Sequence, residues 1–458
     1  MTRLWIILWL SLPFGLNAQR INHAGRILGN PPSVTNAVLF NTPEADDIVS
    51  RLQIFPPDNA WNEDISRRPL LTNSTAMVSQ IAADLQASRR GIRAFFEMNF
   101  ALVPAQQPLV PITFDLYGDE SDPSPYPIPT LLPIETWPRD TPSNYSLYDW
   151  QRDLYQDGGD RHAIIVQPSS GLIWETWQTQ LQLAVSGTST QWHAANGARF
   201  SMTNNTLRPE GWTSADAAGL SMFAGLVRYD ECQRGVVEHA LRLVVAKTRR
   251  SHVYPATHHA STDTSPNRPA MGQRLRLRSS FVIPPEWSKE EKAVLVALKK
   301  YGALVADNGG FFSLSVAPDQ RWTSAAFSHL TSVSVTNFEV ILGTGANEGP
   351  RSSGAPRVNV GPDRWVRQGA SVSLDAQLTY THSAPLALQW TQYSGPAVAT
   401  LSGVTRTNAI AIFPTPGNYV LMFKADNGVH TPAYDALTVT VRAPTPLPPS
   451  DLHVLYVR

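Results

Sequence analysis

Short stretches in which hydrophobic and polar residues alternate recur along the chain, a pattern typical of β-strands with one buried face. The clearest pair covers residues 161–167 and 172–181, which flank the turn sequence Pro168-Ser169-Ser170-Gly171 and so predict a β-hairpin. Helical spacing of apolar residues is rarer and is strongest over 74–85 and 288–302. Residues 51–343 are therefore predicted to form a mainly β domain, like a β-sandwich or jelly roll, with a few peripheral helices.

The C-terminal part of the chain has a different texture. Residues 344–356 are small and polar, as in a linker, and strict alternation of apolar and polar residues follows from Ser371 onward. The segments WTQYSGP from Trp390 and PGNYVLMFKADNG from Pro416, with Asp435 before the last strand, resemble PKD domains. This resemblance implies an immunoglobulin-like β-sandwich over 357–442 that acts as a spacer or adhesion module.

The two ends of the chain complete the predicted domain organisation. Arg3 followed by the apolar segment 4–16 predicts a signal peptide over 1–18, because the segment is shorter than the ~20 residues of a membrane span. Residues 19–50 are predicted to be an irregular leader, and 443–458 a Pro-rich tail. We see no later membrane span, so the mature chain is expected to be secreted or held at the cell surface.

Composition narrows the classes of partner. Lys plus Arg and Asp plus Glu number 37 each, so no overall positive field favours nucleic acid. The single cysteine, Cys232, excludes an internal disulfide. A catalytic thiol is one interpretation of Cys232, but a small residue in a turn is favoured because nothing nearby in sequence would lower its pKa. We expect a monomer with no cofactor.

Five segments of the first domain resemble an uncharacterised family of secreted bacterial proteins. In chain order they are GWTSADAAGL, GLVRYDE, HALRL, PATHH and YGALVADNGG. The resemblance spans roughly residues 50–340, and it implies no catalytic assignment.

The stretch 209–245 is the densest in candidate chemistry. Ser214 is predicted to cap a helix with Asp216 in its first turn, and 236–245 to form a strand. We expect a site where the Asp160–His162 strand start meets the segment 229–238, since so many polar groups must pair, face solvent or line a cleft. An internal ion-pair network is the alternative. The candidate catalytic residues are Asp160, His162, Glu175, Tyr229, Asp230, Glu231 and Glu238.

Several candidates have competing structural interpretations. His162 would suit general acid–base work with Asp160 orienting it, yet it shares a strand face with Ile164 and Val166 and could equally be a core histidine. His239 is predicted to be core. A glycosidase would need two facing carboxyl groups roughly 5 to 9.5 Å apart, which sequence spacing cannot place. The histidines His193, His252, His258 and His259 lack a metal-binding spacing, so no metal is predicted.

Binding candidates are mainly arginines. Three of them alternate along 274–278 on one strand face and could bind an acidic polysaccharide, although such a row is also how the wet face of a sheet looks. The Pro-rich segment 118–140 is either the floor of a sugar groove or, as we favour, a rigid strap across a sheet. The predicted substrate-binding residues are Arg161, Trp174, Arg242, Arg274, Arg276 and Arg278.

These features together predict an exported, glycan-interacting protein. It would be a carbohydrate-active enzyme, either a hydrolase or a lyase, with a PKD-like spacer and a polysaccharide or cell-surface glycan as partner. The alternative is a non-catalytic surface-binding or adhesion protein.

Overall fold

The computed structural model describes residues 19–153, 159–183 and 190–444. The predicted signal peptide, residues 157 and 158 of the Asp157–Asp160 turn, and the tail from residue 445 lie outside these ranges. The chain divides into two compact units: unit 2 comprises Leu28–Ser353 with Asn22–Ala24, and unit 1 comprises Gly354–Arg458, Gly25–Ile27 and the residues before Asn22. Both units are built mainly of strands, which confirms the predicted fold class.

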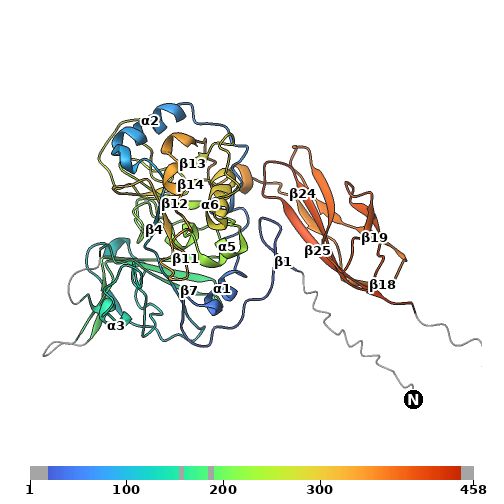
Figure 1. Ribbon diagram of the computed structural model, residues 1–458, viewed down its shortest axis with the longest axis horizontal. Coiled ribbons are helices and arrows are strands. Elements are labelled where there is room, and N and C mark those ends of the chain that lie inside the picture. Colours follow the sequence, from blue (N-terminus) through green and yellow to red (C-terminus); the bar gives the residue numbers. More distant parts are fainter. Residues whose placement is uncertain (1–18, 154–158, 184–189, 445–458) are drawn as a thin grey trace, which may run out of the picture. The chain divides into compact units, whose positions relative to one another are not determined.

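Three sheets form the framework of unit 2 (Figure 1). The five-stranded sheet runs in the order β11 (Asn196–Ser201), β8 (Leu172–Trp177), β7 (Ala163–Gln167), β5 (Ala101–Leu102), β3 (Val38–Leu39). The six-stranded sheet runs in the order β16 (Phe338–Val340), β13 (Arg274–Leu277), β14 (Ala303–Asn308), β12 (Leu241–Val245), β15 (Ser313–Val316), β4 (Arg93–Phe96). The three-stranded sheet consists of β6 (Ile112–Phe114), β10 (Gln191–Ala194) and β9 (Gln180–Gln182).

Parallel and antiparallel pairs are mixed in these sheets. The predicted hairpin forms as the antiparallel pair β7–β8, because Pro168 to Gly171 supply the tight turn. In contrast, β12 pairs in parallel with β14, and such a pair requires a long crossover that here includes β13 and a helix.

The helices of unit 2 are short and lie beside the sheets. Their bounds are α1 (Pro43–Val49), α2 (Ser74–Asp84), α3 (Leu147–Arg152), α4 (Met222–Gly225), α5 (Tyr229–Arg234) and α6 (Lys289–Lys300). The predicted capping box of α6 is present, with Ser288 Oγ accepting from the Glu291 amide and Glu291 accepting from the Ser288 amide. Among the described residues, no helix combines the length and apolarity needed to cross a bilayer.

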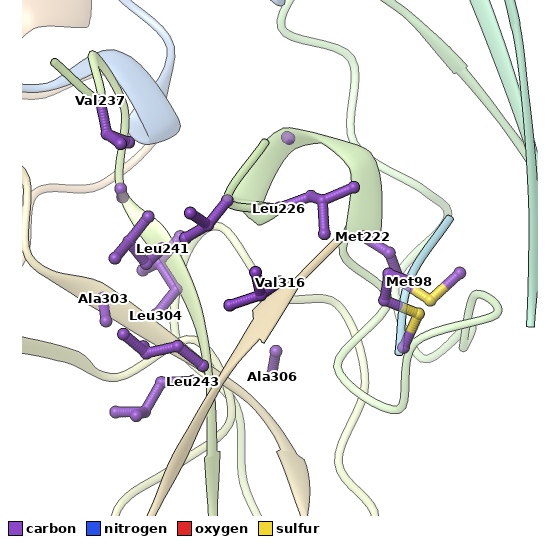
Figure 2. Packing of buried hydrophobic residues seen from close by; sticks show 14 of the residues in the cluster. Met98, Met222, Leu226, Val237, Leu241, Leu243, Ala303, Leu304, Ala306 and Val316 are labelled. Atoms are coloured by element: carbon purple, nitrogen blue, oxygen red, sulfur yellow. The ribbon is translucent and has the colours of Figure 1, made fainter. Parts of the chain in front are cut away.

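The central cluster is a set of buried apolar side chains that come from both the five- and six-stranded sheets and from helices that include α2 and α6. Ile164 and Ile173 enter it from the five-stranded sheet, and Leu243 and Val316 from the six-stranded sheet. Figure 2 shows part of it, with Leu241 and Leu243 of β12 and Met222 of α4. Two β-sheets packed on one apolar core form a sandwich-like arrangement.

A second apolar cluster covers the opposite face of the five-stranded sheet. Trp174 and Ile165 point into it from β8 and β7, and Trp192 from the three-stranded sheet. The Pro-rich segment 118–140 also contributes, through buried residues that include Tyr126 and Ile134. The segment is therefore packed as a strap and not laid open as a groove floor. Because the five-stranded sheet is covered on both faces, all five residues of β7 are buried.

The structure corrects the predictions for 209–245. Residues 229–234 form α5 and the strand begins at Leu241, not Val236. A helix starts at residue 229 because Arg228 and Glu231 make a capping pair, and Gly235 ends it in the left-handed region at φ 76°. Ser214 caps no helix, since its Oγ donates to backbone carbonyls and accepts from the Asp216 amide.

The leader and the linker are also more structured than predicted. Residues 43–49 form α1, which Thr42 caps by accepting from the Ala45 amide. In the segment 344–356, Arg351 belongs to unit 2 and contacts Glu63 at 3.1 Å and the ring of Tyr254. The partner of Arg351, Glu63, lies far away in sequence. The composition of the segment alone therefore could not show that the segment is held in place.

Unit 1 is an all-β sandwich with its own core. Its sheets are β17 (Arg357–Asn359) with β20 (Gln377–Thr379); β18 (Arg364–Arg367), β25 (Ala433–Arg442), β24 (Gly417–Asp426) and β21 (Ala387–Ser394); and β19 (Ser371–Asp375), β23 (Asn408–Ile412) and β22 (Thr400–Ser402). Trp390 and Phe423 pack at the centre with ring centroids 4.9 Å apart. The hydroxyl of buried Tyr419 donates to the Thr415 carbonyl at 3.0 Å, as in the tyrosine corner of immunoglobulin-like folds.

Candidate functional site

A pocket of about 230 Å³ opens in unit 2 where the start of β7 and the end of β8 meet the end of β14. Two loops, over 213–217 and 258–260, complete its wall. We call it the β7–β14 pocket. It is lined by Tyr117, Asp160, His162, Trp177, Thr213, Ser214, Ala215, Ala217, His258, Ala260, Asp307 and Asn308.

One wall of the β7–β14 pocket is aromatic. The rings of Tyr117 and Trp177 lie 6.1 Å apart between centroids, and Tyr117 is 39% exposed. Trp177 is positioned by the end of β8, and Tyr117 by its amide, which donates to the Ala195 carbonyl. Paired aromatic faces of this kind offer a stacking surface to a ligand ring or to a cation.

His162 lies in the lining but both of its ring nitrogens are engaged. Nδ1 donates to Glu135 Oε2 at 2.8 Å, and Nε2 donates to the Ala215 carbonyl at 3.1 Å. Burial lowers the pKa of His162, but the Glu135 carboxylate outweighs it and brings the pKa to about 9. A histidine held as a cation with two acceptors is a poor general base and serves to fix the loop at Ala215.

This ion pair gives a testable pH dependence. We expect its stabilisation to be fully present below about pH 6.5, the pKa in the unfolded chain, and to be lost as pH rises through about 9. For a side chain buried this deeply, the difference corresponds to roughly 3 kcal/mol. Urea denaturation from about pH 6 to about pH 10 measures the slope. Glu135→Gln should flatten it, and a slope unchanged in that variant would contradict the assignment.

Arg242 organises a buried cluster of charges behind the pocket. Its guanidinium contacts Asp216 at 2.9 and 3.1 Å, Asp307 at 3.1 Å and Glu97 at 3.3 Å. It is 2% exposed, so its charge is used internally and is unavailable to an acidic polysaccharide. Burial raises the pKa of Glu97 to about 6, although Arg242 opposes the shift.

Two groups of the pocket, Asp160 and His258, keep free hydrogen-bonding capacity. The exposed carboxylate of Asp160 has no side-chain partner among the described residues. Asn308 Oδ1 is buried without a partner. His258 Nδ1 donates to the Ala217 carbonyl at 2.8 Å, which leaves Nε2 as an acceptor in the neutral ring. Because Asn308 Oδ1 has almost no accessible surface, the acceptors that the pocket offers to a ligand are those of Asp160 and His258.

The segment 229–238 does not contribute to this pocket. Asp230 and Glu231 are buried in an ion-pair network with Arg228, and His239 Nε2 lies 3.0 Å from Glu231. Burial disfavours the charge on Glu231, but Arg228 outweighs it and lowers the pKa to about 2. The predicted meeting of this segment with Asp160 is therefore wrong for the β7–β14 pocket, and the network alternative describes these side chains better.

The other predicted residues of this region are also engaged elsewhere. Tyr229 packs on Trp322 and under the guanidinium of Arg321. Glu238 accepts from Asn22 at 2.9 Å. Neither side chain lines the pocket.

Glu175 lies buried within unit 2, away from the lining. It accepts from the Ser221 hydroxyl and from the amides of Met222 and Phe223 at 2.7 to 3.0 Å, so it closes the N-terminus of α4. Burial raises its pKa to about 7 even though three donors favour the carboxylate.

We expect Glu175→Gln to destabilise the protein by about 1–3 kcal/mol, because the amide NH2 would replace one acceptor and leave a buried amide unpaired. Glu286→Gln, on an exposed glutamate, is the matched control and should change stability little. Chemical denaturation of both variants makes the comparison. Equal stability would remove the structural role from Glu175.

The predicted binding arginines are occupied by backbone carbonyls and acids. Arg274 donates to the carbonyls of Ala60, Glu63 and Tyr301, and Arg276 pairs with Glu339. The remaining predicted binding groups are also placed structurally: Arg161 donates to carbonyls of 150, 151 and 179, Trp174 is in the second cluster, and Arg278 donates to the Phe338 carbonyl.

The histidines at 252, 258 and 259 lie close together. His252, His258 and His259 stack on one another, and His252 Nε2 lies 2.7 Å from Glu210. Among the described residues, no group of three or more potential ligands has the geometry to hold a metal ion. Cys232 is buried in the central cluster, where burial raises its pKa.

Two larger depressions hold less candidate chemistry. One of about 1060 Å³ is lined by Pro, Ala, Gln and other uncharged residues. Another, of about 300 Å³, is lined by Glu63, which pairs with Arg68 and Arg351, and by Arg274, whose guanidinium donates to backbone carbonyls.

Sequence reasoning therefore found Asp160 and His162 but missed the rest of the pocket. Trp177 lies within the second strand of the predicted hairpin, and Asp307 with Asn308 was interpreted as a turn. The signals were present, but only the fold brings residues 117, 177, 258 and 307 to one place.

Comparison with known proteins gives a limited result. No family model and no curated protein matches the chain, so the resemblance to secreted bacterial proteins stays a prediction. Among solved structures, the PKD domain of human KIAA0319 is 18% identical, with 24% of this chain and 100% of that chain covered and a TM-score of 0.20. The PKD domain from KIAA 1837 protein is 18% identical over 22% and 98%, with a TM-score of 0.18. Titin M3 is 13% identical over 20% and 99%, with a TM-score of 0.16.

Proposed function

We propose that the protein is an exported glycan-binding protein and that the β7–β14 pocket holds one sugar residue. The observation that carries the proposal is the meeting of an aromatic pair, Tyr117 and Trp177, with unengaged polar groups in one cavity. Sugar rings present apolar C–H faces and a rim of hydroxyls, which suit an aromatic wall beside hydrogen-bonding side chains.

The size of the pocket supports a single sugar unit. About 230 Å³ is below the roughly 300–1,000 Å³ typical of sites for drug-sized ligands. A chain end or one side-chain sugar fits this volume better than an extended polysaccharide. In this proposal unit 1, which has its own core, is a spacer domain of a secreted or cell-surface protein.

The experiment is a glycan array probed with the mature chain, followed by calorimetric titration of the best ligand. Trp177→Ala should weaken binding by about 5- to 150-fold, because stacking on an aromatic ring contributes about 1–3 kcal/mol in comparable ligand contacts. Trp365→Ala is the matched control, since Trp365 is exposed and lies in the other unit. Undiminished binding by Trp177→Ala would overturn the assignment of the pocket.

Glycoside hydrolysis is the second candidate, favoured by the presence of two carboxylates, Asp160 and Asp307, in the same lining. Such enzymes use a pair of carboxyl groups flanking the scissile bond. A depolymerisation screen of neutral and acidic polysaccharides, read by reducing ends, tests it. Turnover that is lost in Asp160→Asn and kept in Asp140→Asn, on an exposed aspartate outside the pocket, would establish an enzyme.

A further inference from the structure

The charges around the β7–β14 pocket are predominantly negative. Asp160 and Asp307 are the acids in the lining, and no Lys or Arg is among its described residues. His162 is cationic, but both of its N–H groups donate to Glu135 and Ala215. His162 therefore has no unused N–H group to donate to an anionic ligand.

The layer behind the lining adds to this imbalance. Around Arg242 and His162 stand four carboxylates, those of Glu97, Glu135, Asp216 and Asp307. The carboxyl groups in contact with Arg242 and His162 therefore outnumber these two basic side chains, and Asp160 adds a further carboxylate in the lining. Because these groups are shielded from solvent, their field is screened less than that of surface charges.

The unengaged polar atoms of the pocket are hydrogen-bond acceptors, which suit a positively charged donor. The Asp160 carboxylate is an acceptor without a side-chain partner among the described residues, and His258 Nε2 is an acceptor in the tautomer whose Nδ1 donates to Ala217. A primary ammonium carries three donors, and its charge is attracted by the faces of Tyr117 and Trp177.

We propose that the β7–β14 pocket selects an amino sugar whose amine is free and protonated, such as a glucosamine unit, over its N-acetylated counterpart. This inference rests on the proposed glycan binding and adds the chemical class of the sugar. Acetylation removes the charge and two of the three N–H donors, so it removes the feature that the pocket recognises while leaving the ring to stack.

The test compares short oligomers of glucosamine and of N-acetylglucosamine, titrated calorimetrically into the full chain. We expect the free-amine oligomer to bind about tenfold more tightly and its affinity to fall with added salt. Asp160→Asn should bring the two affinities close together, and Asp140→Asn should keep the preference. Asp160 is exposed, so the variant should fold, which far-UV circular dichroism checks.

The outcomes separate this inference from the proposed function. Equal or tighter binding of the acetylated oligomer, or of neutral sugars, would overturn the amine preference and leave glycan binding intact. Binding of choline or lysine as tightly as the glucosamine oligomer would show that the ammonium is recognised without a sugar and would overturn the amino-sugar assignment. No binding of any sugar would overturn the proposed function itself.

Discussion

Replacing Arg242 with methionine should lower the free energy of unfolding by about 3–5 kcal/mol, the largest effect expected in unit 2. Arg242 is 2% exposed and Asp216 is 0% exposed, and the methionine would leave the carboxylates of Asp216 and Glu97 without their cation. A buried carboxylate without its cation has lost both its hydration and its partner. The free energy lost is therefore much larger than the net contribution of the intact pair to stability. Urea denaturation measures the loss.

Two controls identify the cause of that loss. Arg199→Met, at an exposed arginine, should change stability by less than about 0.5 kcal/mol. Adding Asp216→Asn to Arg242→Met should recover part of the loss, since the two changes are coupled through one contact. An Arg242→Met protein within about 1 kcal/mol of the wild type would mean that the cluster does not hold the loops behind the pocket.

Replacing Trp390 with alanine should destabilise unit 1 by about 3–5 kcal/mol. Trp390 is 1% exposed, packs on Phe423, and donates through Nε1 to the Thr407 carbonyl. The core around it consists of residues 358–441, with no side chain from unit 2. Calorimetry should therefore show the unit 1 transition lowered or lost and the unit 2 transition unchanged.

This prediction also tests the division of the chain into domains. Trp365→Ala, at a tryptophan that is 59% exposed, is the control and should have a small effect. A single transition that moves as a whole in Trp390→Ala would show that the two units unfold together.

The sequence predicted those parts of the fold that local chemistry determines. The β7–β8 hairpin follows from its turn, and α6 from its Ser288–Glu291 capping box. The helix α5 was missed because its first turn is stabilised by Arg228, a residue that hydrophobic periodicity ignores. Periodicity likewise reports that a face is apolar, but not that β7 is covered on both faces.

The candidate site was predictable only in part for the same reason. Asp160 and His162 stood out at a strand start, whereas Glu135, the partner of His162, comes from a strap with no regular period. Charged residues such as Glu231 and Arg276 looked available because sequence does not show their partners. Networks of buried ion pairs and functional clefts have the same composition, and only tertiary contacts distinguish them.

The most direct test of the central claim is the position of the bound sugar. In protein labelled with ¹⁵N at tryptophan, the indole N–H signal of Trp177, assigned with Trp177→Phe, should shift and saturate as the best array ligand is added. The signal of Trp365 in unit 1 should stay in place. A ligand that saturates the protein while the Trp177 signal does not move would contradict the assignment of the β7–β14 pocket.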